Sequence, residues 1–142
     1  MRQSLDFETL VHAAADAIIA ADAEGKIVFW NAAATRIFGF TAEKALGESL
    51  DLIIPERFRA RHWEGYRQVM STGETKYGSA VLRVPARHRD GKALSIAFTV
   101  TLLDAPGGES RLIAAIVRDE TARWNEEGAL RQRLSELEQA AK

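Results

Sequence analysis

The sequence predicts an α+β fold in which short helices cover one face of a five-stranded antiparallel sheet, with a further helix near each end of the chain. Three observations predict it: a β-hairpin pattern near the N-terminus, helical periodicity in the middle, and alternation of apolar and polar residues after that. The chain has 142 residues, which is enough for one domain to bury its own core.

The N-terminal segment predicts a short helix followed by a hairpin. Residues 6–14 have an amphipathic pattern, with apolar side chains on one side of the predicted helix. Residues 17–22 and 26–30 are short apolar runs on either side of a turn at 23–25. This spacing is typical of a β-hairpin in which Gly25 takes a positive φ.

Two short helices are predicted after the hairpin. Asn31 is a suitable N-cap for a helix over 32–38 that ends at Gly39, because its side chain can accept from free backbone N–H groups. Thr41 caps a second short helix that stops at Gly47.

A third and longer helix is predicted after Pro55, since proline fits the first helical turn, where a missing N–H costs nothing. It ends near Gly73, and the arginines at its start lie on a solvated face. Its inward stripe consists of Phe58, His62, Gly65, Tyr66 and Val69. The only imidazole of this helix therefore points toward the core or a bound ligand. Neutral imidazole is a common metal ligand, and a buried one needs a partner.

Three further strands are predicted over 77–89, 93–103 and 111–118, separated by turn residues at 89–92 and 104–108. The middle strand has one apolar face, formed by Ile96, Phe98, Val100 and Leu102.

The chain closes with an amphipathic helix after residue 121. Its leucine seam is shorter than two heptads, which is too short for a stable coiled coil alone. Apolar stripes at both chain ends need covering, so we expect a homodimer. The alternative is that the last helix packs back on its own domain. The stripe residues are Phe7, Leu10 and Val11 at one end and Leu130, Leu134, Leu137 and Ala141 at the other.

Composition excludes several classes of function. There is no cysteine, which excludes disulfides, thiolate metal sites and a cysteine nucleophile. The 19 basic and 20 acidic residues give a net charge of −1, so the totals carry no nucleic-acid footprint. Without a membrane-spanning run or a signal-peptide core, we expect a cytoplasmic protein. We find no nucleophile triad or phosphate loop, and we do not expect an enzyme.

The order and spacing of the motifs resemble those of the PAS domain, from residue 7 to residue 121. The resemblance implies a helical cap over 1–14, a PAS core over 15–118 and a signalling or dimerisation helix over 119–142. It also implies a sensor, of the kind found in signalling and transcription-control proteins, that holds a ligand between sheet and helices and passes its state to a partner or effector domain. The matching segments are 16–22 (DAIIAAD), 25–31 (GKIVFWN), 38–41 (FGFT), 46–47 (LG), 54–55 (IP), 72–74 (TGE), 89–91 (RDG) and 117–121 (VRDET).

The segment from Pro55 to His62 is similar to that of oxygen-sensing haem PAS domains of the rhizobial histidine-kinase type. The histidine there is the proximal iron ligand, so the resemblance implies haem b with His62 as metal ligand. The spacing from His62 to the turn at 89–91 also fits. Leu82 stands where those sensors carry the arginine that stabilises bound oxygen, and Arg83 would point to the other face. An apolar distal pocket implies weaker discrimination for oxygen and leaves CO and NO as ligands.

Other readings of the same residues remain open. The cavity can instead hold an apolar ligand, fatty acyl or aromatic. A closed core, with His62 hydrogen-bonded inside it, would make the chain a ligand-free interaction module. Trp30, Trp63 and Trp124 can stack on a flavin but are more often core or dimer contacts. The residues expected to line the pocket are Ile53, Ile54, His62, Tyr66, Val69, Met70, Leu82, Ile96 and Phe98.

Overall fold

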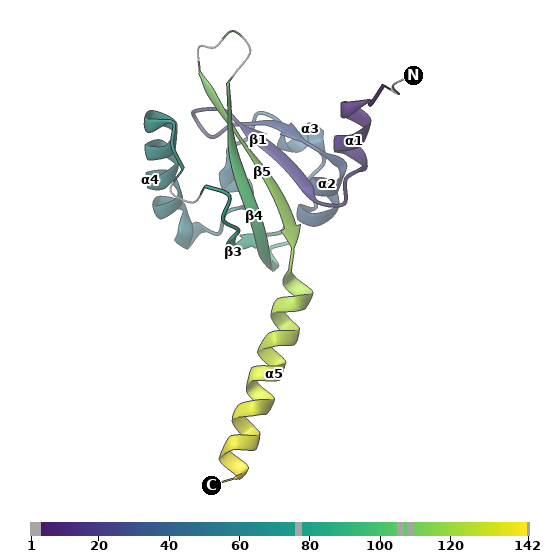
Figure 1. The fold of residues 1–142 in the computed structure, drawn as a ribbon, viewed down its shortest axis with the longest axis vertical. Helices are drawn as coiled ribbons and strands as arrows, with labels where there is room; N and C mark the ends of the chain where they lie inside the picture. The colour runs from purple at the N-terminus through teal and green to yellow at the C-terminus, as the bar shows by residue number, and fades with distance from the viewer. Residues whose placement is uncertain (1–3, 76–77, 105–106, 108–109, 142) are drawn as a thin grey trace.

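The sheet and its helices confirm the predicted α+β architecture. A computed structural model describes residues 4–75, 78–104, 107 and 110–141. Five strands form one antiparallel sheet in the order β2-β1-β5-β4-β3 (Figure 1). In chain order the elements are α1 (Phe7–Ala13), β1 (Ala17–Ala21), β2 (Ile27–Trp30), α2 (Ala32–Phe38), α3 (Ala42–Ala45), the 3-10 helix η1 (Leu50–Ile53), α4 (Glu56–Thr72), β3 (Leu82–Arg87), β4 (Ala93–Asp104), β5 (Arg111–Asp119) and α5 (Thr121–Ala140).

The β1–β2 hairpin forms as predicted. The Asp22 carboxylate accepts from the backbone N–H groups of Glu24 and Lys26, each at 2.9 Å, and so holds the turn. Gly25 takes a φ of +81°, a left-handed conformation that glycine adopts without steric cost.

Asn31 caps α2 as predicted, and it also ties three elements together. Its Oδ1 accepts from the N–H groups of Ala34 at 3.0 Å and Ile18 at 2.9 Å. Its Nδ2 donates to the carbonyls of Val11 at 2.8 Å and Asp16 at 3.2 Å. The side chain is buried with all these groups satisfied, which is the condition under which a buried amide stabilises a fold.

The half of the sheet under α2 and α3 has a closed core. Ala34, Phe38 and Ala45 are fully buried there, and the small alanines let the helices approach the sheet closely. The Trp30 indole is 2 % exposed, and its N–H donates to the Phe40 carbonyl at 3.0 Å. Trp30 is thus a core residue.

The first of the three later strands is shorter than predicted. We expected it over 77–89, but β3 begins at Leu82 because Gly78 takes a φ of +55° in a turn. It ends at Arg87 because His88 to Lys92 close the next turn through two backbone hydrogen bonds. Tyr77 and three residues of the predicted turn at 104–108 lie outside the described residues.

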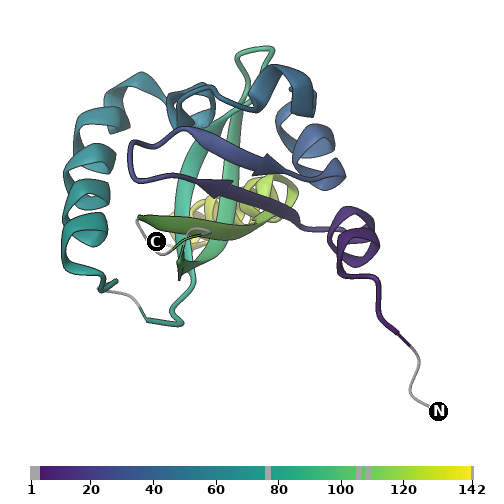
Figure 2. The same ribbon diagram turned by 90° about the horizontal axis from the view of Figure 1, so that it is seen from above.

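The helix α5 points away from the sheet (Figures 1 and 2). None of its side chains over Thr121–Ala140 is buried, and its three seam leucines are each more than half exposed. Within residues 4–75, 78–104, 107 and 110–141, no helix has the length and apolarity needed to cross a membrane.

Candidate ligand-binding cavity

A cavity of about 800 Å³ lies between α4 and the sheet. Figure 2 shows α4 standing apart from the strands, on the side opposite α1. Eight of the nine residues predicted to line a pocket do line this cavity: Ile53, Ile54, His62, Tyr66, Val69, Leu82, Ile96 and Phe98. The prediction for Met70 is wrong, because it follows Val69 by a 100° turn of the helix and lies on the flank of the inward stripe.

The helix α4 presents the predicted stripe to the cavity. Pro55 is its N-cap rather than its first helical residue, with a φ of −57°. Phe58, Gly65 and Val69 line the cavity together with His62 and Tyr66. The helix ends at Gly73, which has a φ of +75° and donates its N–H to the Val69 carbonyl at 2.9 Å.

Three side chains hold the first three turns of α4, residues 56–66, to neighbouring segments. Arg59 donates to the carbonyls of Ile54 at 3.0 Å and Asp51 at 3.1 Å. We expected this arginine on a solvated face, but the structure shows it half-buried, because its guanidinium bonds to the segment that precedes α4. The Trp63 indole N–H donates to Asp51 Oδ1 at 2.7 Å.

Tyr66 is the most buried residue of α4 and the third of these anchors. Its hydroxyl donates to the Asp22 carbonyl in the hairpin turn. Burial raises the pKa of Tyr66 above its usual value, so the group stays protonated and remains a donor.

His62 has the chemical features of an uncommitted ligand. In the described part of the chain, its Nδ1 is the one buried side-chain nitrogen or oxygen atom without a hydrogen-bond partner. The ring packs against Trp63 and Tyr66, with centroid distances of 4.6 and 5.6 Å. Burial lowers the pKa of His62, and the nearby Asp51 carboxylate only partly opposes this. The imidazole is therefore neutral at pH 7, the form that binds metals.

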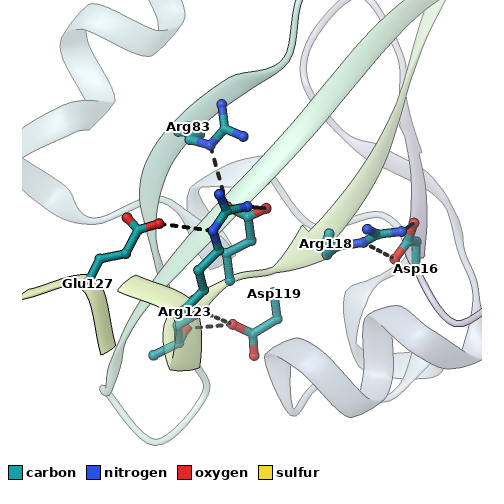
Figure 3. Close-up of polar contacts among 8 residues, drawn as sticks. Asp16, Arg83, Arg118, Asp119, Arg123 and Glu127 are labelled. Carbon is teal, nitrogen blue, oxygen red and sulfur yellow. Dashed lines mark hydrogen bonds and ion pairs between the residues drawn. The ribbon is translucent and has the colours of Figure 1, made fainter. Parts of the chain in front are cut away.

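The opposite wall of the cavity comes from β3 and β4. Leu82 pairs with Phe98 and Val84 pairs with Ile96, so these apolar side chains share the inward face. Arg83 falls between them in the alternation, and its guanidinium pairs with Glu120 at 3.4 Å (Figure 3). Arg83 also borders the cavity, but its guanidinium pairs with Glu120, whereas Leu82 occupies the position on the inward face.

The base of α5 is tied to the strands that form this wall. The Asp119 carboxylate accepts from the Thr121 N–H at 2.9 Å and from its hydroxyl at 2.5 Å (Figure 3). The Thr121 oxygen in turn accepts from the Ser95 N–H at 3.0 Å, which joins α5 to β4.

A second ion pair lies at the other side of this base. Arg118 contacts both carboxylate oxygens of Asp16, at 3.1 and 3.2 Å, and links the start of β1 to the end of β5 (Figure 3). No local pattern in the sequence indicates this pair, because the two residues are 102 positions apart.

The tryptophans and acidic side chains offer no alternative site. Trp63 packs against Gly25, and Trp124 is exposed beneath Arg131. None of the three tryptophans lines the cavity, so the interpretation that they stack on a flavin there is wrong. Among the described residues, no cluster of three or more His, Cys, Asp or Glu side chains could hold a metal ion.

Comparisons with known proteins show which family has this architecture. The family model described as the PAS fold matches residues 5–119. The chain is 36% identical over 116 residues to an uncharacterized protein of Azorhizobium caulinodans, covering 81% of this chain and 16% of that protein. It is 27% identical over 129 residues to the sensor protein FixL of Bradyrhizobium diazoefficiens, covering 91% of this chain and 25% of FixL.

The oxygen sensor protein DosP of Escherichia coli is 25% identical over 107 residues, which is 75% of this chain and 13% of DosP. The chain thus spans a quarter or less of the length of these relatives.

Among solved structures, a PAS domain from Colwellia psychrerythraea superposes with a TM-score of 0.69 at 18% identity, covering 82% of this chain and 95% of that one. An RNA-binding light-oxygen-voltage receptor superposes with a TM-score of 0.71 at 21% sequence identity, covering 91% of this chain and 36% of the receptor. At these identities the likeness concerns the fold.

Proposed function

The chain belongs to the PAS-fold family and is a sensory signal-transduction domain, and from this premise we propose that it binds haem b through His62 and senses a diatomic gas. The observation that carries the proposal is the unpartnered, buried Nδ1 of a neutral imidazole beside an apolar cavity of about 800 Å³. Cavities of that size are within the range that binds small molecules and cofactors.

The residues present fit this cofactor. His62 would be the protein ligand of the iron, while Tyr66 and Val69 on its helix and Leu82 and Phe98 on the facing strands would hold the cofactor by apolar contact. Haem supplies an iron centre whose response to gases is tuned by the polarity of its pocket. Leu82 offers no hydrogen-bond donor, so we expect weaker discrimination for oxygen than in sensors with arginine there, with CO and NO as candidate signals.

The relatives support a sensor of this kind. DosP is named as an oxygen sensor and FixL as a sensor, and each matches most of this chain. The segment from Pro55 to His62 carries the resemblance to haem PAS domains of the rhizobial type. Identity of 25–27% leaves the cofactor to be tested on this chain itself.

Transfer of the signal would use the ties between the cavity wall and α5. The strands that carry Leu82 and Phe98 also hold Glu120 through Arg83 and Thr121 through Ser95. A ligand can shift α5 only if it binds two arrangements of this wall with different affinity. Output would then pass from α5 to a partner protein or effector domain.

Replacing the proposed ligand tests the haem assignment. Purified protein should take up haemin with a Soret shift, and His62→Ala should lose haemin on gel filtration while keeping its circular dichroism, because the metal bond is lost and the apolar wall remains. Added imidazole should restore the Soret shift in His62→Ala. The control His12→Ala, which changes an exposed histidine of α1, should bind haemin normally. Haemin binding that is equal in His62→Ala and wild type would end the proposal.

A second occupant is favoured by the distribution of polarity in the cavity. Its walls are mostly apolar, with Arg61 and Arg83 at its border, and Gln68, Thr72, Glu74 and Thr75 line it near the end of α4. An amphipathic fatty acyl ligand would suit such a site, with its tail between Ile96 and Val69. Native mass spectrometry of protein with mixed fatty acids would show a one-to-one complex if this alternative is correct.

We also propose that the domain forms a homodimer through its terminal helices. Phe7 and Leu10 on α1 and the three seam leucines of α5 are all more than half exposed. Such apolar stripes on both terminal helices favour symmetric pairing.

Light scattering tests the dimer. Wild-type protein should have a dimer mass at micromolar concentration, and Leu134→Lys should dissociate it because a charge would enter the seam. The control Gln132→Lys, on the same helix but off the seam, should leave the mass unchanged. A monomer mass for the wild type would contradict this proposal.

A further inference from the structure

The inward-facing row of β5 begins with a charge. Alternate residues of a strand share one face, and Ile113, Ala115 and Val117 all line the cavity. Arg111 occupies the next inward position, at the first residue of the strand. An apolar side chain there would extend the wall, so a half-buried guanidinium at this position requires a specific partner.

That partner is the end of α4. Arg111 Nη1 donates to the Met70 carbonyl oxygen at 2.6 Å. Met70 is in the last turn of α4, where carbonyls have no partner within the helix and where the helix dipole favours a cation. The guanidinium also lies over Gly73, so closely that a Cβ at this glycine would come within 2.7 Å of Nη2.

The first three turns of α4 (residues 56–66) and its C-terminal end (residues 67–72) are held very differently. Arg59, Trp63 and Tyr66 bond the first three turns to the 3-10 helix, to the residue that follows it, or to the hairpin turn. In the last turn, the side-chain bonds of Ser71 and Thr72 run to the Gln68 carbonyl of the same helix or to the residue after Gly73. Among the hydrogen bonds of the described residues, Arg111 alone joins this end of α4 to the sheet.

We propose that Arg111 is a latch that holds the C-terminal end of α4 (residues 67–72) against β5, and that releasing it opens the cavity at this end for ligand entry and exit. Gln68, Val69 and Thr72 line the cavity in this end of the helix, so a movement here changes the cavity directly. The role in ligand exchange rests on the proposed ligand function, whereas the hold on α4 does not. Arg111 would act through the helix, as a positioning residue that touches no ligand.

Hydrogen exchange in the ligand-free protein tests the latch itself. In Arg111→Met, which keeps most of the apolar stem, the amides of Ser71, Thr72 and Gly73 should exchange about tenfold faster, because a charge-assisted hydrogen bond is lost. Amides of α2 should not change. The control Arg118→Met removes the ion pair with Asp16 at the other end of the same strand, and it should leave α4 exchange at the wild-type rate. Unchanged exchange in Arg111→Met, or an equal increase in Arg118→Met, would overturn the latch.

Ligand exchange tests the opening. Release of haemin to an excess of a haem-scavenging globin should be about tenfold faster from Arg111→Met than from wild type or Arg118→Met, and Arg111→Lys should recover part of the difference. Equal release rates would overturn the gating role. If the wild type does not retain haemin, the haem proposal fails, and the same comparison is made with the uptake rate of the apolar dye anilinonaphthalene sulfonate. Equal uptake by Arg111→Met and wild type would then overturn the gating role independently.

Discussion

The two halves of the covered sheet face differ in how closely their helices approach. Under α2 and α3, alanines and Phe38 pack against β1 and β2 without a gap, and each of these side chains is fully buried. Under α4, the inward stripe carries larger residues, only Tyr66 is buried, and a cavity of about 800 Å³ separates helix and sheet. A single sheet thus has one half with a closed core and one half that borders a cavity, here called the hollow half.

Truncating one phenylalanine in each half should give the largest contrast. Phe38→Ala removes a fully buried ring from the closed half and should cost about 3–5 kcal/mol of unfolding free energy. Phe98→Ala changes a half-buried ring at the edge of an existing cavity and should cost no more than about half as much, since less transfer energy is lost. Urea denaturation of both variants measures this. Equal losses would mean that the cavity wall is packed as tightly as the core.

Gly25 joins the two halves, because Trp63 of α4 packs directly on it. In Gly25→Ala the new Cβ would lie 2.1 Å from the indole, so the ring has to move. The matched control is Gly91→Ala, which has a similar φ of +90° and no atom within 4 Å of its Cβ. Both should lose about 1–2 kcal/mol to the left-handed backbone, and Gly25→Ala should lose about 1–3 kcal/mol more from overpacking.

Near-UV circular dichroism should also change in Gly25→Ala and not in Gly91→Ala. Identical denaturation midpoints for the two variants would show that Trp63 does not anchor α4.

The smallest expected effect is on how the free energy of unfolding depends on pH, through His62 in the hollow half. Burial lowers the pKa of His62 below its ordinary value of 6.5, so the unfolded chain binds a proton at pH values where the folded chain does not. His62 therefore favours folding above pH 6.5, and that contribution is lost as the pH falls through the lowered pKa. The ligand-free wild type should lose more stability than His62→Leu between pH 7.5 and pH 5. Parallel pH profiles in denaturation experiments would contradict this.

Local signals in the sequence were sufficient for most of the fold. The hairpin around Gly25, the Asn31 cap and the helical stripe with His62 each depend on residues close together in the chain, and the structure contains all three. The predicted start of β3 was wrong because the turn at Gly78 delays the strand to Leu82. The prediction that Arg59 is solvated missed its two carbonyl partners, which depend on how the segment before α4 folds back on the helix.

The residues that line the cavity were largely predictable from the sequence, but the hydrogen bonds that hold α4 to the rest of the domain were not. Alternation and helical spacing identified five of the eight confirmed lining residues, since both periods follow from backbone geometry: His62, Tyr66, Val69, Ile96 and Phe98. The bond from Arg111 to Met70 requires the fold to bring β5 beside α4. A signal for it was present, because a charge precedes the alternating row of Ile113, Ala115 and Val117, and an inward charge indicates a partner.

The exposed helix α5 has a mechanical consequence. Its 20 residues make a rod about 30 Å long, fixed at one end by the contacts of Asp119, Glu120 and Thr121. A tilt of about 10° at that fixed end would move the far end by about 5 Å, roughly one helical turn. A small change in the angle of α5 at its base therefore becomes a displacement at its far end that is comparable to the spacing of side chains along a neighbouring helix. Shortening α5 would reduce that displacement in proportion, without altering any contact inside the domain.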